Sequence, residues 1–398
     1  MQDRRTLRMH VLTSLGADPG QVEELLHYNE MSFHGAAPEN FRFPLPDEPF
    51  VEVWEEYARE VLASGSIEVL AKYLVQLRFP VLAGMSQNDD YVSATRRGVS
   101  SVNMSAASGL RLQFPGQCQL VLHQTPGGRI PILIAGNRQD FVLLVQALAK
   151  HNEPAVVPAS MGALILSGYN NWHRIQILRA AFEAAEAPEA SWDEEFQKIK
   201  ANKELFQDRF IILSSGPYSD VDASQIGLDP EQWRGLSLAI RREHECAHYF
   251  TRRTFGSMRN NLIDEMIADY WAIAVTLGAF RADWFLRFFG LEAPSQYRAG
   301  GRLQNYRGNP PLTDGAFLIL QELVRHAARN LEQFDRRCLR ERQQADAQAA
   351  LFMALTALTA EEIASEGGGI LLSESFLRAL HQCAELSSSA SSPRRVFA

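Results

Sequence analysis

Apolar side chains recur every three to four residues over much of the chain, which is the spacing of helices that bury one face. Outside the centre of the chain, the stretches with this spacing are residues 1–30, 50–77, 174–206, 315–364 and 373–386. At the centre, Asp229 suits the N-cap of a helix, Pro230 its first position and Gly256 its end. Asn261 suits the N-cap of the helix that follows. The pattern predicts a mostly helical protein.

A shorter, strand-like pattern of apolar runs interrupts these helices between residues 110 and 215. The candidate strands are residues 117–123, 129–134, 155–157, 163–166 and 209–215. Pro126, Gly127 and Gly128 separate the first two runs and predict a hairpin. A helix is expected over residues 138–150, with Asn137 as its cap. Helices and strands in this order predict an α+β fold.

The central helix carries the motif His-Glu-x-x-His, formed by His244, Glu245 and His248. On a helix of about 3.6 residues per turn, two histidines four positions apart project from the same face. Two imidazoles so placed can hold one Zn²⁺, with Glu245 beside the metal as a general base. Cys246 points to the opposite side of the helix, so we expect a buried thiol there rather than a ligand.

A catalytic zinc takes three protein ligands and leaves one position to water, so a third ligand is required. The next helix offers Glu265 and Asp269, four positions apart on one face, and Asp264 beside them. His-Glu-x-x-His followed by Glu-x-x-x-Asp resembles the zincin metallopeptidases, specifically the gluzincin pattern typified by thermolysin-like enzymes. The resemblance covers residues 244–269. It implies that Glu265 is the third ligand and that Asp269 orients one of the histidines, with Asp264 and Asp269 as local rivals for the ligand position.

Zincins set a twisted sheet beside the active-site helix, and an edge strand of that sheet lines their cleft. We therefore expect a zincin-like core over residues 110–295, between a helical N-terminal region (1–109) and a helical second lobe (296–386) with a disordered tail (387–398). Residues 209–215 are the candidate edge strand, which would bind an extended peptide by backbone hydrogen bonds. An ordinary interior strand is the alternative for the same residues.

In gluzincins, a Tyr, His or Arg outside the motif stabilises the oxyanion that forms during the reaction. The polar loop after the two metal helices contains repeated Arg and Tyr residues and could supply this group here. The resemblance thus makes Tyr297, Arg302 and Tyr306 candidates for the role. The sequence favours none of the three over the others.

Composition and charge limit the number of domains, the partners and the cell compartment that we expect. The 398 residues, 46% of them hydrophobic, suffice for a large core and two or three subdomains. A formal net charge of −8 and a pI near 5.8 argue against nucleic acid as a main partner. The four cysteines show no C-x-x-C spacing and no disulfide framework. The chain lacks a signal peptide and any window of about 18 apolar residues, which predicts a cytoplasmic protein with no membrane partner.

These observations predict a metallopeptidase with one Zn²⁺ per chain and a peptide or protein substrate. Zinc would activate its bound water and polarise the carbonyl, while Glu245 takes the proton and passes it to the leaving amine. Two alternatives remain: an inactive zincin-like domain that binds proteins and keeps zinc for structure, and a zinc hydrolase of a small non-peptide amide. An open cleft with a free edge strand would favour the peptidase, and an enclosed pocket would favour the small substrate. A metal held by a fourth protein side chain would favour the structural role. The sequence leaves the oligomeric state open.

Overall fold

The structure divides the chain into two compact units, each assembled from separated segments. The computed structural model describes residues 2–30, 33, 43–185, 191–256, 261–294, 296–338 and 345–389. The helical unit comprises Met1–Pro46, Thr125–Gly128 and Pro217–Ala398, and the sheet unit comprises Asp47–Gln124 and Arg129–Gly216. The predicted core of residues 110–295 therefore contributes segments to both units.

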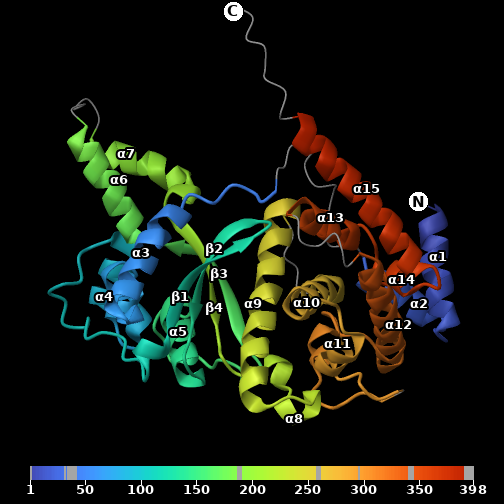
Figure 1. Ribbon diagram of the computed structural model, residues 1–398. Coiled ribbons are helices and arrows are strands. Elements are labelled where there is room, and N and C mark those ends of the chain that lie inside the picture. The colour runs from blue at the N-terminus through green and yellow to red at the C-terminus, as the bar shows by residue number, and fades with distance from the viewer. Residues whose placement is uncertain are drawn as a thin grey trace, which may run out of the picture. The chain divides into compact units, whose positions relative to one another are not determined.

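The helical unit is built mainly from α-helices, and the first helices of the chain pack against the last ones (Figure 1). Its helices are α1 (Gln2–Ser14), α2 (Pro19–Tyr28), α8 (Ala223–Ile226), α9 (Pro230–Phe255), α10 (Leu262–Leu277), α11 (Ala282–Phe289), α12 (Asp314–Cys338), α13 (Ala345–Thr356), α14 (Ala360–Ala364) and α15 (Gly368–Ser389). Contacts join α1 to α14 and α2 to α12. The helices predicted at both ends of the chain are confirmed. Residues 387–389, which the sequence places in a disordered tail, continue α15, and residues 390–398 lie outside the described residues.

Helix α9 begins and ends where the sequence predicts, and α10 begins where it predicts. Asp229 caps α9 by accepting hydrogen bonds from two backbone N–H groups of the first turn, and Pro230 occupies the first position. Gly256 ends α9 in the left-handed conformation, with φ of 65°, which glycine adopts without a steric penalty. Asn261 caps α10 through the Asp264 N–H, at 3.1 Å. Local signals therefore fix both helices before any tertiary contact is considered.

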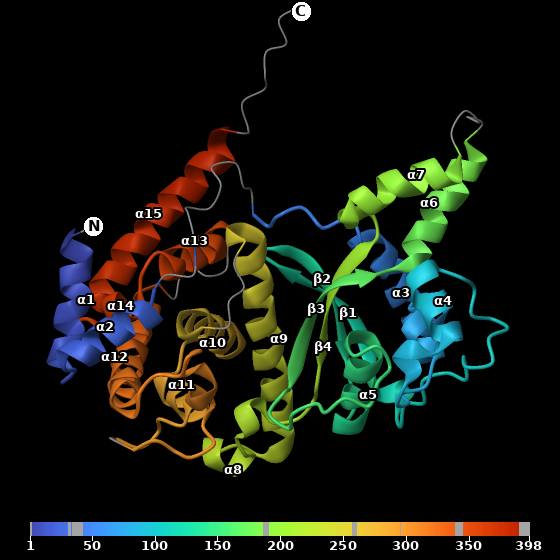
Figure 2. The same ribbon diagram turned by 180° about the vertical axis from the view of Figure 1, so that it is seen from behind.

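Helix α10 lies at the centre of the helical unit and is buried along most of its length. It packs against α9 and also contacts α11 and α13. Figures 1 and 2 show α10 beside α9 from opposite sides. Trp271 of α10 packs on Phe352 of α13, with ring centroids 4.6 Å apart, in the same apolar core. Polar side chains on the α9 side of α10 are consequently buried, and each needs a polar partner.

The sheet unit contains a small mixed sheet with the strand order β1-β2-β4-β3 (Figure 2). Its elements are α3 (Val51–Ser64), α4 (Asp89–Arg97), β1 (Gln119–Thr125), β2 (Gly128–Ile134), α5 (Arg138–Ala149), β3 (Ala163–Asn170), α6 (Trp172–Ala184), α7 (Trp192–Ala201) and β4 (Gln207–Leu213). β2 and β4 are parallel, with Ile132 opposite Ile211, and β3 is antiparallel to β4. Trp54 of α3, Phe141 of α5 and Phe210 of β4 share one buried core. The α+β prediction, mostly helical with a small sheet, is confirmed at this level.

The edge-strand prediction for residues 209–215 is wrong. β4 lies inside the sheet, hydrogen-bonded to β2 on one side and to β3 on the other, so the alternative of an interior strand is confirmed. The four residues from Phe210 to Leu213 are all buried, as in strands covered on both faces. Strand order depends on pairing between distant segments, which apolar patterning cannot reveal. Residues 155–157 form no strand, and Val156 is 89% exposed.

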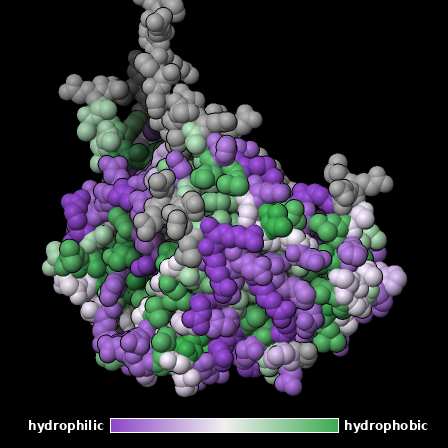
Figure 3. Space-filling model, turned by 45° about the vertical axis from the view of Figure 1, so that its right-hand side comes forward, coloured by the Kyte–Doolittle hydropathy of each residue, from purple (hydrophilic) through white to green (hydrophobic). Residues whose placement is uncertain are grey.

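The described helices include none that is both long and apolar enough to cross a membrane. On the face drawn in Figure 3, hydrophobic residues form small clusters among hydrophilic ones. Neither observation identifies a partner. The predicted cytoplasmic location and the predicted lack of a membrane partner stay predictions.

Candidate metal centre

Three buried side chains from α9 and α10 converge at one point of the helical unit. His244 and His248, one turn apart on α9, place their Nε2 atoms 3.1 Å from each other. Glu265 of α10 lies opposite them, with Oε2 at 3.4 Å from His244 Nε2 and Oε1 at 3.6 Å from His248 Nε2. Each of the three residues is 6% exposed. Two imidazoles and one carboxylate therefore meet in a site that is almost closed to solvent.

These three donors suit a zinc ion in both chemistry and spacing. Two histidines and one glutamate form a known ligand set of catalytic zinc. Tetrahedral ligands at about 2.0–2.1 Å from zinc lie roughly 3.3 Å from one another. The three separations, 3.1, 3.4 and 3.6 Å, are close to that value. Among the described residues, this is the group of His, Cys, Asp and Glu side chains that could hold a metal ion.

A carboxylate behind His244 fixes the orientation of its ring. Asp269, on α10 one turn after Glu265, is fully buried, and its Oδ1 lies 2.8 Å from His244 Nδ1. The tie to Nδ1 directs Nε2 toward the other two donors. The Tyr218 hydroxyl donates to Asp269 Oδ1 at 2.5 Å, and the Arg302 guanidinium donates to Oδ2. The structure thus places Asp269 where the resemblance expects an orienting carboxylate.

A second carboxylate lies behind His248. Asp264 Oδ2 is 3.2 Å from His248 Nδ1, on the side of the ring away from Glu265. Asp264 is 1% exposed, and neither its two oxygens nor His248 Nδ1 forms a hydrogen bond within the described part of the chain. A buried carboxylate without hydrogen bonds lowers the stability of the fold unless a cation or a polarised N–H faces it. Asp264, a rival for the ligand position by sequence, is placed behind a ligand histidine instead.

The three oxyanion candidates differ in where the structure puts them. Arg302 begins the 3₁₀ helix η7 (Arg302–Tyr306) and contacts Asp269, and its Nη1 donates to the Tyr218 hydroxyl at 2.9 Å. Tyr306 ends the same helix and donates from its hydroxyl to Glu265 Oε2 at 2.8 Å. The Tyr297 hydroxyl instead donates to the Gly301 carbonyl within its own loop. Arg302 and Tyr306 therefore support the carboxylates of the centre.

The electrostatic environment of the centre favours positive charge. Burial by itself lowers the pKa of His248, but the charges of Asp264, Glu265 and Glu245 outweigh it and raise this pKa to about 10. Burial likewise opposes ionisation of Glu265, yet contact with His244 holds the pKa of Glu265 below its usual range. The same negative potential that retains protons on the imidazoles attracts a divalent cation. Such a cation must displace those protons when it binds.

Glu245, the expected general base, is half-buried between the buried residues His244 and Cys246. Its charge contributes to the raised pKa of His248, so its carboxylate lies near the donor cluster. Cys246 is a buried, free thiol, as the sequence predicts, and burial raises its pKa well above the ordinary value. The helix thus presents Glu245 to partial solvent and Cys246 to the core.

Sequence reasoning did not identify Tyr218, which lies in the 3₁₀ turn η6 (Tyr218–Asp220) that follows the sheet unit in the chain. Its hydroxyl contacts Asp269, Arg302 and His244 Nδ1. Its backbone N–H donates to the Ser237 hydroxyl on α9, which holds the turn against that helix. No motif marks this tyrosine, because its role arises from contacts with residues far away in the sequence.

Comparisons with known proteins give a family but no activity. The chain belongs to a family of unknown function, DUF7005, whose model matches residues 10–367. No curated protein and no solved structure matches the chain. The resemblance to zincins therefore stays a prediction, based on the motif and supported by the geometry of the centre.

Proposed function

We propose that this member of a family of unknown function is a zinc-dependent metallopeptidase with a zincin-like core. The observation that carries the proposal is the convergence of His244, His248 and Glu265 at separations that suit zinc. Both histidines are backed by carboxylates on their outer nitrogens, which is the arrangement that orients imidazole ligands. A half-buried Glu245 beside them supplies a candidate base.

Each residue of the centre has its own role in the proposed reaction. His244, His248 and Glu265 would hold Zn²⁺, which when bound would acidify water and polarise a scissile carbonyl. Glu245 takes the proton from the attacking water and returns it to the leaving amine. Asp269, through its contact with His244 Nδ1, keeps that imidazole in the tautomer that presents Nε2 to the metal, and the Asp264 carboxylate faces Nδ1 of His248 at 3.2 Å. Among the described residues the donor cluster holds three side chains, the number that leaves one position open to water.

Glu245→Gln tests the proposal directly. Glutamine has nearly the same shape as glutamate and cannot accept the proton, so zinc content and melting temperature should stay close to those of wild type. Cleavage of a peptide library by the zinc-loaded variant should fall by about 10²–10⁴-fold, the usual worth of general acid–base catalysis. Glu231→Gln is the matched control, because Glu231 lies exposed on the first turn of the same helix. It should cleave as wild type does.

Two outcomes would contradict the proposal in different ways. Equal cleavage by wild type and Glu245→Gln would remove Glu245 from the mechanism. No cleavage by the zinc-loaded wild type, across the library and folded protein substrates, would favour a domain that keeps zinc for structure and binds a partner. Cleavage confined to small amides would favour the third alternative.

A further inference from the structure

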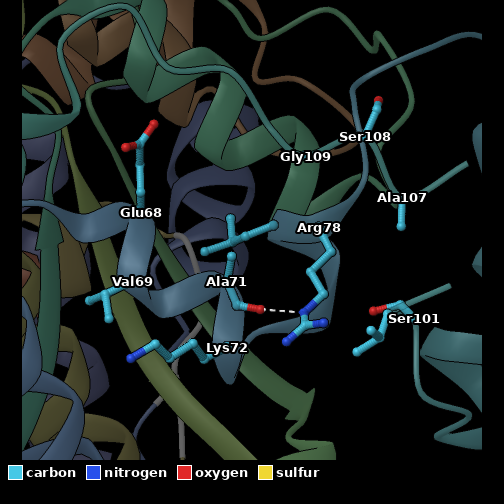
Figure 4. A pocket seen from close by; sticks show the side chains of 11 residues that line it. Glu68, Val69, Ala71, Lys72, Arg78, Ser101, Ala107, Ser108 and Gly109 are labelled. Atoms are coloured by element: carbon cyan, nitrogen blue, oxygen red, sulfur yellow. Dashed lines mark hydrogen bonds between the residues drawn. The ribbon is translucent and has the colours of Figure 1, made fainter. Parts of the chain in front are cut away.

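The sheet unit contains a second candidate site, a cleft of about 440 Å³. Its walls come from the 3₁₀ helices η1 (Ile67–Lys72) and η2 (Val75–Arg78) and from the loop of residues 101–109 (Figure 4). A smaller cavity of about 160 Å³ adjoins it, since Lys72, Arg78, Ser101 and Val102 line both. Small-molecule sites in proteins have volumes of about 300–1,000 Å³. The cleft is therefore large enough for a small ligand.

Arg78 is a cation of this cleft that has no anionic partner among the described residues. It is half-buried, and its Nε donates to the Ala71 carbonyl at 2.6 Å, which fixes the plane of the guanidinium. Within the described part of the chain, no carboxylate pairs with Arg78 and its Nη1 and Nη2 form no hydrogen bond. A guanidinium whose forked donors are oriented but unused is suited to a planar or tetrahedral anion.

The other charged residues of the cleft do not compete for that position. Lys72 donates from Nζ to Glu60 at 2.9 Å, so its charge is already paired. Figure 4 shows the Lys72 ammonium and the Glu68 carboxylate directed away from the Arg78 guanidinium, with Ser101 across from it. Ser101 is 5% exposed and adds a hydroxyl to the wall. One cation and one hydroxyl thus face a common space.

The remaining wall of the cleft is mostly apolar. Side chains of Val69, Ala71, Leu77, Val102 and Ala107 contribute to it. Leu77 belongs to the core of the sheet unit, and Val69 and Ala71 pack against that core, so this part of the wall is held in place. An apolar surface beside a single oriented cation is typical of sites that bind an organic anion.

We propose that this cleft binds an organic anion, whose carboxylate or phosphate group is held by Arg78 and whose apolar body lies along Val69, Leu77 and Ala107. The anion would take the two Arg78 donors that have no partner and neutralise a half-buried charge. Burial of its apolar part would add affinity that a bare inorganic ion lacks. This site is independent of the zinc centre, because none of its residues is a metal ligand or contacts one.

Isothermal titration calorimetry of anion binding to the full-length, zinc-loaded protein tests this proposal. The probes are inorganic phosphate, phenyl phosphate, hexanoate and the neutral analogue hexanamide. At least one of phenyl phosphate and hexanoate should bind saturably and more tightly than inorganic phosphate, while hexanamide should not bind. Comparison of phenyl phosphate with hexanoate shows which anionic group the cleft takes. Because anions also bind zinc, only the part of the measured binding that is lost in Arg78→Gln is assigned to the cleft.

Arg78→Gln should weaken binding of the preferred anion by about 10–100-fold, the loss expected for charge-assisted hydrogen bonds. Arg59→Gln is the matched control, since Arg59 is exposed on α3 of the same unit and should leave binding unchanged. Ser108→Trp keeps Arg78 and fills the cleft from an exposed position, so it should also abolish binding. It decides the question if Arg78→Gln does not fold. Absence of anion binding by wild type, equal affinity for hexanamide, or full affinity in Ser108→Trp or folded Arg78→Gln would overturn the proposal.

Discussion

At the scale of single residues, we expect the candidate centre to depend strongly on Asp269, which does not belong to the proposed ligand set. This buried carboxylate accepts hydrogen bonds from Tyr218 and Arg302 and faces His244 Nδ1 at 2.8 Å. A buried carboxylate is tolerated when its oxygens are bonded. The three partners therefore hold Asp269 in place, and Asp269 in turn holds the imidazole. Metal affinity should reflect this chain of contacts as well as the ligands themselves.

Asp269→Asn should lower zinc affinity by about 10–100-fold, as loss of an orienting carboxylate commonly does. The amide carries no charge to hold the imidazole and leaves the Arg302 cation unpaired. Competition with a chelator of known affinity measures the change. Asp335→Asn is the matched control, because Asp335 is also fully buried in the helical unit and accepts from Tyr270 at 2.9 Å. It should lower stability and spare zinc affinity. Equal losses of affinity in both variants would mean that Asp269 acts through stability alone.

Zinc affinity should rise with pH. The pKa of His248 without metal is about 10, above the usual value of about 6.5, so this imidazole is protonated at pH 7 and zinc must displace the proton. Each displaced proton should tighten binding by about tenfold per pH unit, measurable by chelator competition between about pH 6 and 8. The stability of the metal-free fold depends on pH with the opposite sign. A raised pKa stabilises the metal-free protein fully below about pH 6.5, and this contribution is lost as pH rises toward 10. Affinity that does not change with pH would show that no proton leaves the site.

At the scale of elements, the centre is a product of two packed helices. α9 supplies the histidines and Glu245, and α10 supplies Glu265, Asp264 and Asp269. Each helix has its own cap and its own glycine stop, so each can form in register independently of the other. The contact between the two helices then brings the two sets of side chains together. The cap of α9 should therefore affect stability more than metal binding.

Asp229→Ala should destabilise the helical unit by about 1 kcal/mol, the usual cost of losing an N-cap side chain, and lower the urea midpoint. Zinc affinity of the folded protein should not change, because His244 lies about 22 Å along the helix from the cap. Asp222→Ala removes the corresponding cap from the short helix α8. It is the control for loss of a cap in a helix that carries no residue of the centre. Its effect should be smaller. A fall in zinc affinity in Asp229→Ala would show that fraying of the first turn reaches the centre.

At the scale of the whole molecule, the chain has two units with separate cores. The core of the helical unit includes Ile240, Met266 and Phe352, and the core of the sheet unit includes Trp54 and Phe210. The two sets of core residues do not overlap. A ligand that binds one unit stabilises that unit by mass action and need not stabilise the other.

Removal of zinc with a chelator should raise amide hydrogen exchange in α9 and α10 and leave β2 and β4 unchanged. Hydrogen–deuterium exchange read by mass spectrometry measures this segment by segment. Glu265→Ala is the matched variant, because a chain that has lost most of its zinc should respond little to the chelator. A uniform increase across the sheet strands would instead show that the two units open together.

Much of the centre follows from local signals in the sequence. The caps of α9 and α10, their glycine stops and the spacing of His244 and His248 are all set within a few residues, and the structure confirms these helices. The same holds for the hairpin after β1 and for the cap of α5. These features are predictable because helix periodicity and capping depend on residues within one or two turns.

Other features depend on contacts between distant segments, and these were decided by tertiary structure alone. Packing of α10 on α9 places Glu265 opposite the histidines and Asp264 behind His248, although both carboxylates lie on neighbouring positions of one helix. Tyr218 reaches Asp269 across 51 positions of sequence. β4 became an interior strand because β3 and β2 both pair with it. Sequence periodicity determines which face of an element is buried, whereas the partner of that face is selected by the packing of the whole unit.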